Sequence, residues 1–319
     1  MPEPPERSPT SSAASARAAT ASVRATAAQS NDTWTDVLRD YLTLTKPEIS
    51  FLVTVSAFAG FLLGSPAGLD GTILLFTLIG TGLCAGGVGM LNHCREHALD
   101  AQMKRTAARP IPTGRIPLKH AEWTGTGMVC AGVGVLCPLV NPPTAVLAAL
   151  TAILYLYVYT PLKRHTKYNT LIGTIPGALP ALGGYVAATG TFGLSGWVIF
   201  AILVCWQMPH FLSLAWMYRN DYARGNYAML PVLEPSGDST AYQIIAFTVL
   251  LLGISVLPTV TGPMGWIYLV GVIPLGLWFL LTALQFHLER TGIRARRVLK
   301  ASIVYVPALV VLLTVDWLF

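Results

Sequence analysis

Three oxygen-bearing side chains recur at intervals of four residues in the first third of the chain. Asn92, Glu96 and Asp100 occupy positions i, i+4 and i+8. In an α-helix this spacing places all three on one face. Mg²⁺ is typically bound by one or two carboxylates together with the phosphate groups of a substrate. The spacing therefore indicates a metal-binding face, provided that one helix continues through all three residues.

A basic cluster follows this face directly. Lys104, Arg105 and Arg109 precede Pro110, where we expect the helix to end, just past the cluster. The positive charges suit the phosphate oxygens of a substrate. The alternative is a solvated helix end, at which the two acidic residues simply pair with Arg95 and its basic neighbours. The spacing alone does not distinguish these interpretations.

A second polar segment, residues 206–231, carries another candidate metal ligand. Asp221 could complete a metal site opposite the first face, and Arg219 could bind anionic groups. His210 lies about three helical turns earlier, within an uncharged stretch. An ionisable residue inside a membrane span is usually functional. A packed histidine with a structural hydrogen bond is the simpler interpretation.

A third segment places Lys163 and Arg164 shortly after Tyr159, at the end of another uncharged stretch. Its charges could bind an anionic substrate beside the first face. They could equally serve only to keep this end of the protein on one side of a membrane. These residues alone favour neither interpretation.

The composition shows what kind of protein must position these residues. Of 319 residues, 53% are hydrophobic and only 11% are charged, and the net charge is +6. The mean hydropathy is +0.57, and soluble domains usually carry about 25% charged residues. So much apolar surface requires a bilayer, where backbone groups must be paired within helices or a closed barrel. The apolar stretches are continuous rather than alternating, so we predict an all-α membrane protein without a nucleic-acid partner.

Six stretches of the sequence lack Asp, Glu, Lys and Arg. They are residues 49–69, 71–94, 123–162, 168–218, 239–288 and 301–315. One membrane span needs about 20 residues, and each of the three longest stretches is interrupted by a turn containing Gly or Pro. Two single spans, three pairs and one final span predict a bundle of nine transmembrane helices.

The basic residues predict the orientation of this bundle. All 21 lysines and arginines lie in the N-terminal tail or in the second, fourth, sixth and eighth loops between the predicted spans. By the positive-inside rule, these loops and the N-terminus face the cytoplasm of a bacterium or, as the alternative, the matrix of a mitochondrion. Residues 1–38 are rich in Ala, Ser, Thr and Pro, and we predict a disordered tail there and a transmembrane domain over residues 39–319. A transit peptide is the competing interpretation of the tail.

Several motifs in these segments resemble those of the UbiA-type intramembrane prenyltransferases. The first comprises Asn92, Glu96, Asp100, Met103, Arg105, Thr106, Arg109 and Pro110. The others are Leu44-Thr45-Lys46-Pro47, residues 159–164, and residues 206–211 with Asp221, Tyr222, Gly225 and residues 229–231. The resemblance covers residues 41–319, and the Pro-His-Phe and Asp-Tyr elements are most similar to the heme-modifying branch, the protoheme IX farnesyltransferases.

Two positions depart from the superfamily pattern. Glu96 stands where Asp is commoner, which keeps the charge and lengthens the side chain. Gly225 stands where other branches carry a second Asp, and the heme-modifying branch shares this feature. Asp221 is then the acidic candidate for the second metal contact.

The resemblance implies a UbiA-type fold and transfer of a farnesyl group from farnesyl diphosphate to a vinyl group of heme b, making heme O. The implied catalytic set is Asn92, Glu96, Asp100, Arg105, Arg109 and Asp221, of which Asn92, Glu96, Asp100 and Asp221 would hold Mg²⁺. The implied substrate contacts are Lys46, Lys104, Lys163, Arg164, His210, Arg219 and Tyr222. The implied setting is a bacterial inner membrane, with a heme A synthase or a second copy of the chain as partner.

Two other functions are compatible with the sequence, and a third, that of a purely structural assembly factor, would not need the face of Asn92, Glu96 and Asp100. A prenyltransferase for a quinone precursor or a chlorophyll-type ring would share the metal site and differ in its acceptor. A secondary transporter would also have paired spans, but the predicted spans contain no ionisable relay beyond His210 and no obvious pair of broken helices. An assay that offers several acceptors distinguishes these functions.

Overall fold

The structure is a computed structural model that describes residues 33–319. Most of the predicted disordered tail, residues 1–32, lies outside the described residues, and the first described helix begins at Trp34. The chain divides after Arg39, and Asp40–Phe319 is the second of its two units. The second unit carries every residue predicted to bind metal or substrate.

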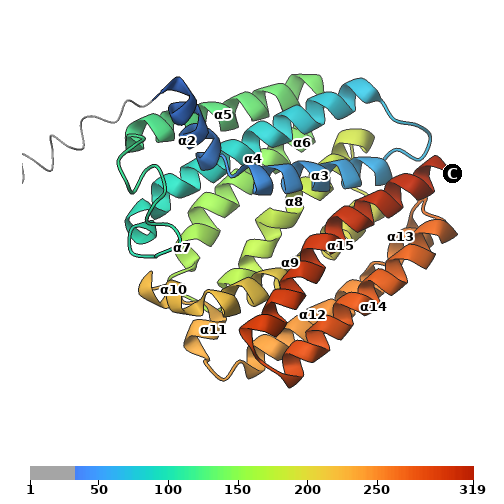
Figure 1. Cartoon of the computed structure of the whole chain (residues 1–319). Helices are drawn as coiled ribbons and strands as arrows, with labels where there is room; N and C mark the ends of the chain where they lie inside the picture. Colours follow the sequence, from blue (N-terminus) through green and yellow to red (C-terminus); the bar gives the residue numbers. More distant parts are fainter. Residues whose placement is uncertain (1–32) are drawn as a thin grey trace, which may run out of the picture. The chain divides into compact units, whose positions relative to one another are not determined.

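The described residues form helices and turns without a β-strand, which confirms the predicted all-α fold (Figure 1). The helices are α2 (Trp34–Leu44), α3 (Pro47–Leu63), α4 (Gly71–Asp100), α5 (Leu118–Leu139), α6 (Pro142–Ile153), the π-helix η1 (Leu154–Tyr159), α7 (Thr160–Leu162), α8 (Asn169–Thr189), α9 (Leu194–Met217), α10 (Arg219–Arg224), α11 (Leu230–Leu233), α12 (Asp238–Ile254), α13 (Leu257–Thr261), α14 (Trp266–Leu288) and α15 (Gly292–Leu318).

The long helices of the second unit close into a bundle. Each packs against its neighbour along the chain, from α3 through α4, α5, α6, α8, α9, α12 and α14 to α15. The last helix, α15, returns to pack against α3, and α3 also packs along α8 (Figure 1). The first and last spans of the bundle are therefore neighbours.

Seven helical segments of the described residues are long and apolar enough to cross a membrane, or eight when α2 and α3 are counted as one bent span. The chain is therefore an integral membrane protein. The predicted count of nine is not confirmed. Of the predicted spans, α3 meets the criterion only together with α2, and α5 does not meet it. The first turns of α5 carry Lys119 and Glu122, and Gly and Thr are frequent beyond them.

Glycines let the backbones of neighbouring helices touch. A β-carbon added to Gly60 of α3 or to Gly184 of α8 would collide with a carbonyl group of the other helix. Between α4 and α5, a β-carbon at Gly87 would lie 2.6 Å from the carbonyl oxygen of Gly125. Small residues at helix contacts are typical of membrane bundles, where close van der Waals packing drives association. These contacts hold α4, which carries the predicted metal-binding face, tightly against α5.

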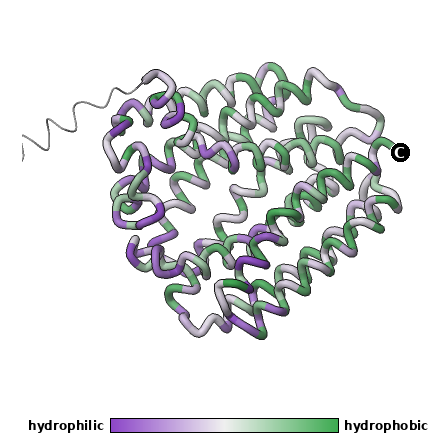
Figure 2. Tube along the Cα trace, in the orientation of Figure 1, coloured by the Kyte–Doolittle hydropathy of each residue, from purple (hydrophilic) through white to green (hydrophobic). Residues whose placement is uncertain are grey.

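Hydrophilic residues gather at one end of the bundle. Figure 2 shows them in the loops that follow α4, α7 and α9, whereas apolar residues run along the helices. These are three of the loops in which the basic residues of the sequence are concentrated. The chemically active side chains predicted from the sequence therefore share one end of the bundle.

Candidate active site

The helix α4 continues through Asn92, Glu96 and Asp100, as their spacing predicts. All three are buried, with exposed fractions of 1%, 6% and 1%. A solvated helix end would leave such side chains open to water, so the structure does not support that alternative. Buried acidic groups persist when they are paired, and each residue of this face has a cationic partner from outside α4.

The end of α4 lies earlier than predicted. The last helical residue is Asp100, and residues 101–117 form turns, so the basic cluster is not helical and Pro110 does not end the helix. The Thr106 hydroxyl donates to the carbonyl oxygen of Asp100 at 2.8 Å. The amide of Thr106 donates to the carbonyl oxygen of Met103 at 3.1 Å. These bonds satisfy carbonyl groups near the helix end and turn the chain back toward α4, so that Arg109 reaches Asp100.

Arg109 binds the carboxylate of Asp100. Its Nη1 donates to Oδ2 of Asp100 at 2.7 Å. The Asp100 side chain is only 2% exposed, whereas the Arg109 side chain is 23% exposed. The guanidinium group is therefore the accessible member of this pair, and it can turn toward an incoming anion.

Lys46 binds the first residue of the face. Its Nζ donates to Oδ1 of Asn92 at 2.5 Å, and the Asn92 amide group donates to the hydroxyl of Thr160 at 3.2 Å. Lys46 has a φ of 50°, in the left-handed region that residues with side chains rarely adopt. Such backbone strain costs about 1–3 kcal/mol and tends to occur at functional sites. This left-handed residue precedes α3, and its ammonium group lies on the α4 face.

Glu96 has two partners. Lys163 Nζ donates to Oε1 of Glu96 at 2.8 Å, and Tyr227 forms a hydrogen bond with the same side chain. Burial lowers the pKa of Lys163, but the Glu96 charge outweighs this effect and holds that pKa well above its ordinary value. Burial and the same charge raise the pKa of Tyr227. Lys163 therefore stays cationic and Tyr227 stays protonated, so both can donate to Glu96.

Backbone contacts join the loop after α7 to the loop after α10. The amide of Ala228 donates to the carbonyl oxygen of Lys163 at 2.8 Å. The side-chain amide of Asn169 donates to the carbonyl oxygen of Ala228 at 2.9 Å. Asn226, with a φ of 53°, turns the chain just before Tyr227. The two loops together hold Lys163 and Tyr227 at Glu96.

Asp221 connects the second acidic segment to the turns that follow α4. It is 8% exposed, and its carboxylate accepts from Arg224 at 2.8 Å and from the backbone amide of Arg105 at 3.3 Å. Among residues 33–319, no three His, Cys, Asp or Glu side chains lie close enough to hold a metal ion. Asp221 therefore does not form a preassembled metal cage with Glu96 and Asp100.

The donor set nevertheless fits Mg²⁺ when the ion arrives with a phosphate-bearing substrate. Mg²⁺ keeps several water ligands and usually takes only one or two carboxylates, together with substrate phosphates. Glu96 and Asp100 supply buried carboxylates on one helix face, and Asn92 supplies an amide oxygen. The cations that now neutralise this face are the groups that phosphate oxygens would attract.

Two further predicted contacts lie near Asp221. Arg219 packs over Trp216, with its guanidinium carbon 4.5 Å from the ring centroid. Tyr222 packs edge-on against Tyr227, with the ring centroids 5.7 Å apart. Tyr222 thus contacts Tyr227, the residue that is hydrogen-bonded to the Glu96 carboxylate. The proposed contacts of both residues with a substrate stay predictions.

The other predicted substrate contacts are not gathered on the α4 face. Of these predicted contacts, Lys104 and Arg164 are exposed, as is Arg105 of the predicted catalytic set. His210 lies on α9, where its Nδ1 is 2.8 Å from the hydroxyl of Ser302 on α15. Its ring packs against Trp206, with the centroids 5.1 Å apart. His210 therefore has the structural hydrogen bond of the simpler interpretation, and its contact with a substrate stays a prediction.

Sequence reasoning missed two partners of the α4 face. Thr160 follows Tyr159 in the third segment, and Tyr227 lies between Asp221 and the end of the second polar segment. The position of each within a motif was the available signal. The contacts themselves, Thr160 with Asn92 and Tyr227 with Glu96, join residues far apart in the sequence.

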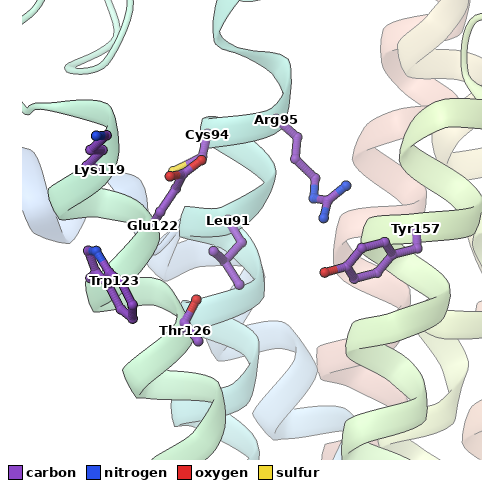
Figure 3. Close-up of a pocket in the computed structure, with 8 residues that line it drawn as sticks. All are labelled: Leu91, Cys94, Arg95, Lys119, Glu122, Trp123, Thr126 and Tyr157. Atoms are coloured by element: carbon purple, nitrogen blue, oxygen red, sulfur yellow. The ribbon is translucent and has the colours of Figure 1, made fainter.

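A separate pocket lies on another side of α4 (Figure 3). It has a volume of about 550 Å³ and is lined by Leu91, Cys94, Arg95, Lys119, Glu122, Trp123, Thr126 and Tyr157. The Arg95 guanidinium carbon lies 4.0 Å from the centroid of the Tyr157 ring. With 3.6 residues per turn, Leu91, Cys94 and Arg95 point away from the acidic face. None of the predicted site residues lines this pocket.

Comparisons with known proteins agree with the motifs. Residues 53–306 match the UbiA prenyltransferase family. A protoheme IX farnesyltransferase of Salinibacter ruber is 68% identical over 281 residues, which cover 88% of this chain and 99% of that protein.

Two solved structures share the fold. A structure of a digeranylgeranylglyceryl phosphate synthase has a TM-score of 0.73 at 18% identity and covers 88% of this chain and 98% of that one. A UbiA homologue from Archaeoglobus fulgidus, bound to GPP and Mg²⁺, has a TM-score of 0.58 at 12% identity and covers 86% of this chain and 99% of that one. At these identities the likeness concerns the fold, which is the predicted UbiA-type bundle.

Proposed function

Because the chain belongs to the UbiA prenyltransferase family, we propose that it transfers a farnesyl group from farnesyl diphosphate to a vinyl group of heme b, making heme O. The 68% identical relative bears the name of that reaction. The observation that carries the proposal is the buried α4 face, where Asn92, Glu96 and Asp100 each meet a cation from outside the helix. Family membership favours an enzyme over a transporter.

Lys46, Lys163 and Arg109 supply the positive charge that a diphosphate requires. Without substrate they neutralise the α4 face. A diphosphate carries more negative charge than any one of their present partners, so it draws these groups toward itself. Fixed cations in a site that excludes water stabilise the charge that develops as the bond between C1 and oxygen breaks. Their task in the reaction is thus to bind the diphosphate and to stabilise it as the leaving group.

The same face is the proposed site of Mg²⁺. Asn92, Glu96 and Asp100 would hold the ion together with the diphosphate, and Asp221 would add a contact from the second segment. Bound Mg²⁺ withdraws charge from phosphate oxygens and so assists departure of the diphosphate. The Archaeoglobus fulgidus homologue was solved with GPP and Mg²⁺, which supports the same pairing of ion and diphosphate here.

Aromatic side chains near Lys163 would protect the reactive prenyl group. Tyr155 and Tyr159 of η1 pack edge to face, with ring centroids 5.3 Å apart, and Tyr222 of α10 packs in the same way against Tyr227. Aromatic faces attract cations, and a dry site prevents premature capture by water. The heme vinyl group would attack C1 of the farnesyl chain. Water would then add to the resulting cation on heme and release a proton, which leaves the hydroxyl group of heme O.

The cellular setting is part of the proposal. The concentration of Lys and Arg in alternate loops supports a bacterial inner membrane with a cytoplasmic N-terminus. A heme A synthase or a second copy of this chain is the proposed protein partner. Labelling of single cysteines introduced into the loops tests the orientation, and co-purification and sizing in detergent test the partners.

The reaction is tested with purified protein in detergent, supplied with heme b, farnesyl diphosphate and Mg²⁺. Mass spectrometry of extracted heme should show a gain of one farnesyl group plus one hydroxyl group, abolished by EDTA and restored by added Mg²⁺. Prenylation of a phenolic acid instead of heme would retain the metal site and change the acceptor. No turnover of either acceptor would contradict the proposed function.

A further inference from the structure

One polar side chain near the α4 carboxylates has no bonding partner. His93 is 3% exposed, and neither of its ring nitrogens has a hydrogen-bond partner among residues 33–319. Buried polar groups in folded proteins are normally bonded, and an exception calls for a physical explanation. His93 is one residue from Asn92 and belongs to none of the roles described above.

Nδ1 of His93 lies near a carboxylate oxygen that is already bonded. Residues seven apart on a helix lie two turns apart on nearly the same side, and Nδ1 of His93 is 3.9 Å from Oδ2 of Asp100. That distance is too long for a hydrogen bond. The same Oδ2 accepts from Arg109 at 2.7 Å. Arg109 is the one side chain that forms a hydrogen bond to the Asp100 carboxylate in the described structure.

The charged groups around His93 show that the site can accept an anion. Lys46, Arg109 and Lys163 act on the ring electrostatically, and the nearby carboxylates belong to Glu96 and Asp100. Three basic side chains face two carboxylates here, so the site can accept further negative charge. A diphosphate would supply that charge and would attract Arg109, whose side chain is the more accessible member of its pair.

We propose that His93 is a positioning residue that holds Asp100 once Arg109 has turned toward a diphosphate. In the neutral ring with hydrogen on Nδ1, that N–H donates to Oδ2 of Asp100 after a shift of about 1 Å. Asp100 then keeps its orientation, and its other oxygen is directed to the metal ion. Carboxylates that bind metals are commonly held in this way by a second hydrogen bond. The inference rests on the proposed function because it requires a substrate that carries a diphosphate. It does not depend on which molecule accepts the prenyl group.

The test measures metal binding directly, without heme or a prenyl chain. Mn²⁺ and a fixed concentration of inorganic diphosphate are equilibrated by dialysis against the full-length protein, and the excess of Mn²⁺ on the protein side gives the bound ion, corrected for the complex of Mn²⁺ with free diphosphate. His93→Phe keeps a ring and removes both nitrogens, so the dissociation constant of Mn²⁺ should rise about tenfold or more. His93→Gln retains a donor and should stay within about threefold of the unsubstituted protein.

Two controls separate positioning from folding. His97→Phe makes the same replacement one turn further along α4, where Nδ1 lies 2.7 Å from the carbonyl oxygen of Cys94, and it should leave Mn²⁺ binding unchanged. Thermal unfolding without ligand should be no lower for His93→Phe than for the unsubstituted protein, because no hydrogen bond is lost.

Two results would overturn the role of His93. One is unchanged Mn²⁺ binding by His93→Phe. The other is that His93→Phe unfolds at a lower temperature than the unsubstituted protein and His93→Gln also loses Mn²⁺ binding. A purely structural residue would behave in this way. Tight Mn²⁺ binding by the unsubstituted protein without any heme product would sink the proposed reaction and leave the inference about His93 standing.

Discussion

The bundle has two acidic regions at the end where the hydrophilic loops gather, and their carboxylates form ion pairs of different kinds. On α4, Glu96 is bonded to Lys163, a residue 67 positions away, and the Glu96 side chain is only 8% exposed. Asp221 is bonded to Arg224, three positions away, whose side chain is 45% exposed. A buried long-range pair exists only when the whole bundle is folded, whereas a local pair forms within a single helical turn. The comparison indicates that the α4 face defines the site and that Asp221 supplements it.

The largest expected effect is that of Asp100→Asn. The amide keeps the shape of the side chain and removes the negative charge that a divalent ion requires, so kcat for heme O formation should fall about 100-fold to 1000-fold. The measurement is the initial rate of product by mass spectrometry. Asp70→Asn is the matched control, since Asp70 caps the far end of α4 by accepting from the amides of Thr72 and Ile73, and Asn also caps helices. If Asp100→Asn retained more than a tenth of the normal rate, the α4 face would not be the metal-binding part of the active site.

The next largest effect concerns stability. Lys163→Met leaves the Glu96 carboxylate buried without its cation, and breaking a buried pair typically costs about 3–5 kcal/mol. The unfolding temperature in detergent should therefore fall by about 5–10 °C. The double variant Lys163→Met/Glu96→Gln should recover most of this loss, because no unpaired charge remains. Two losses that simply add would show that the pair is not coupled as the geometry implies.

A smaller effect is expected at the second acidic region. Asp221→Asn should lower kcat/KM for farnesyl diphosphate about tenfold and leave the unfolding temperature nearly unchanged. The reason is that its cationic partner is local and half exposed, and the side-chain oxygen of Asn can still accept from the backbone amide of Arg105. Steady-state kinetics beside Asp100→Asn provide the measurement. Equal losses in the two variants would erase the distinction between the two regions.

The smallest effect is expected from the exposed basic residues. Lys104→Gln and Arg164→Gln should each raise KM for farnesyl diphosphate about two- to threefold, with kcat unchanged, because exposed charges attract an anion from a distance. The increase should vanish at about 1 M salt, where such attraction is screened. A salt-independent loss of kcat in either variant would move that residue into the site itself.

Local periodicity explains what the sequence could predict. The face of Asn92, Glu96 and Asp100 depends only on the geometry of one helix, and the structure confirms that helix. The end of the helix was misplaced, because the hydroxyl of Thr106 bonds the carbonyl oxygen of Asp100 and turns the chain ten residues before Pro110. A proline marks where a helix must stop and says nothing about an earlier capping bond.

Contacts between distant segments explain what the sequence could not predict. The meeting of Lys163 and Tyr227 at Glu96 depends on how two loops pack. The left-handed conformation of Lys46 is not predictable either, because a residue before proline favours extended backbone. The unbonded ring of His93 becomes visible only when all of its neighbours are placed. The motif resemblance identified the cations, and the structure assigns each to its partner.

The most direct test of the central claim is an experimental structure of the protein with Mg²⁺ and farnesyl thiolodiphosphate, an unreactive analogue. The account predicts that the diphosphate group lies among Lys46, Lys163 and Arg109, with the metal ion between it and the carboxylates of α4. A diphosphate group bound beside Arg95 and Lys119, in the pocket on the other side of α4, would contradict it.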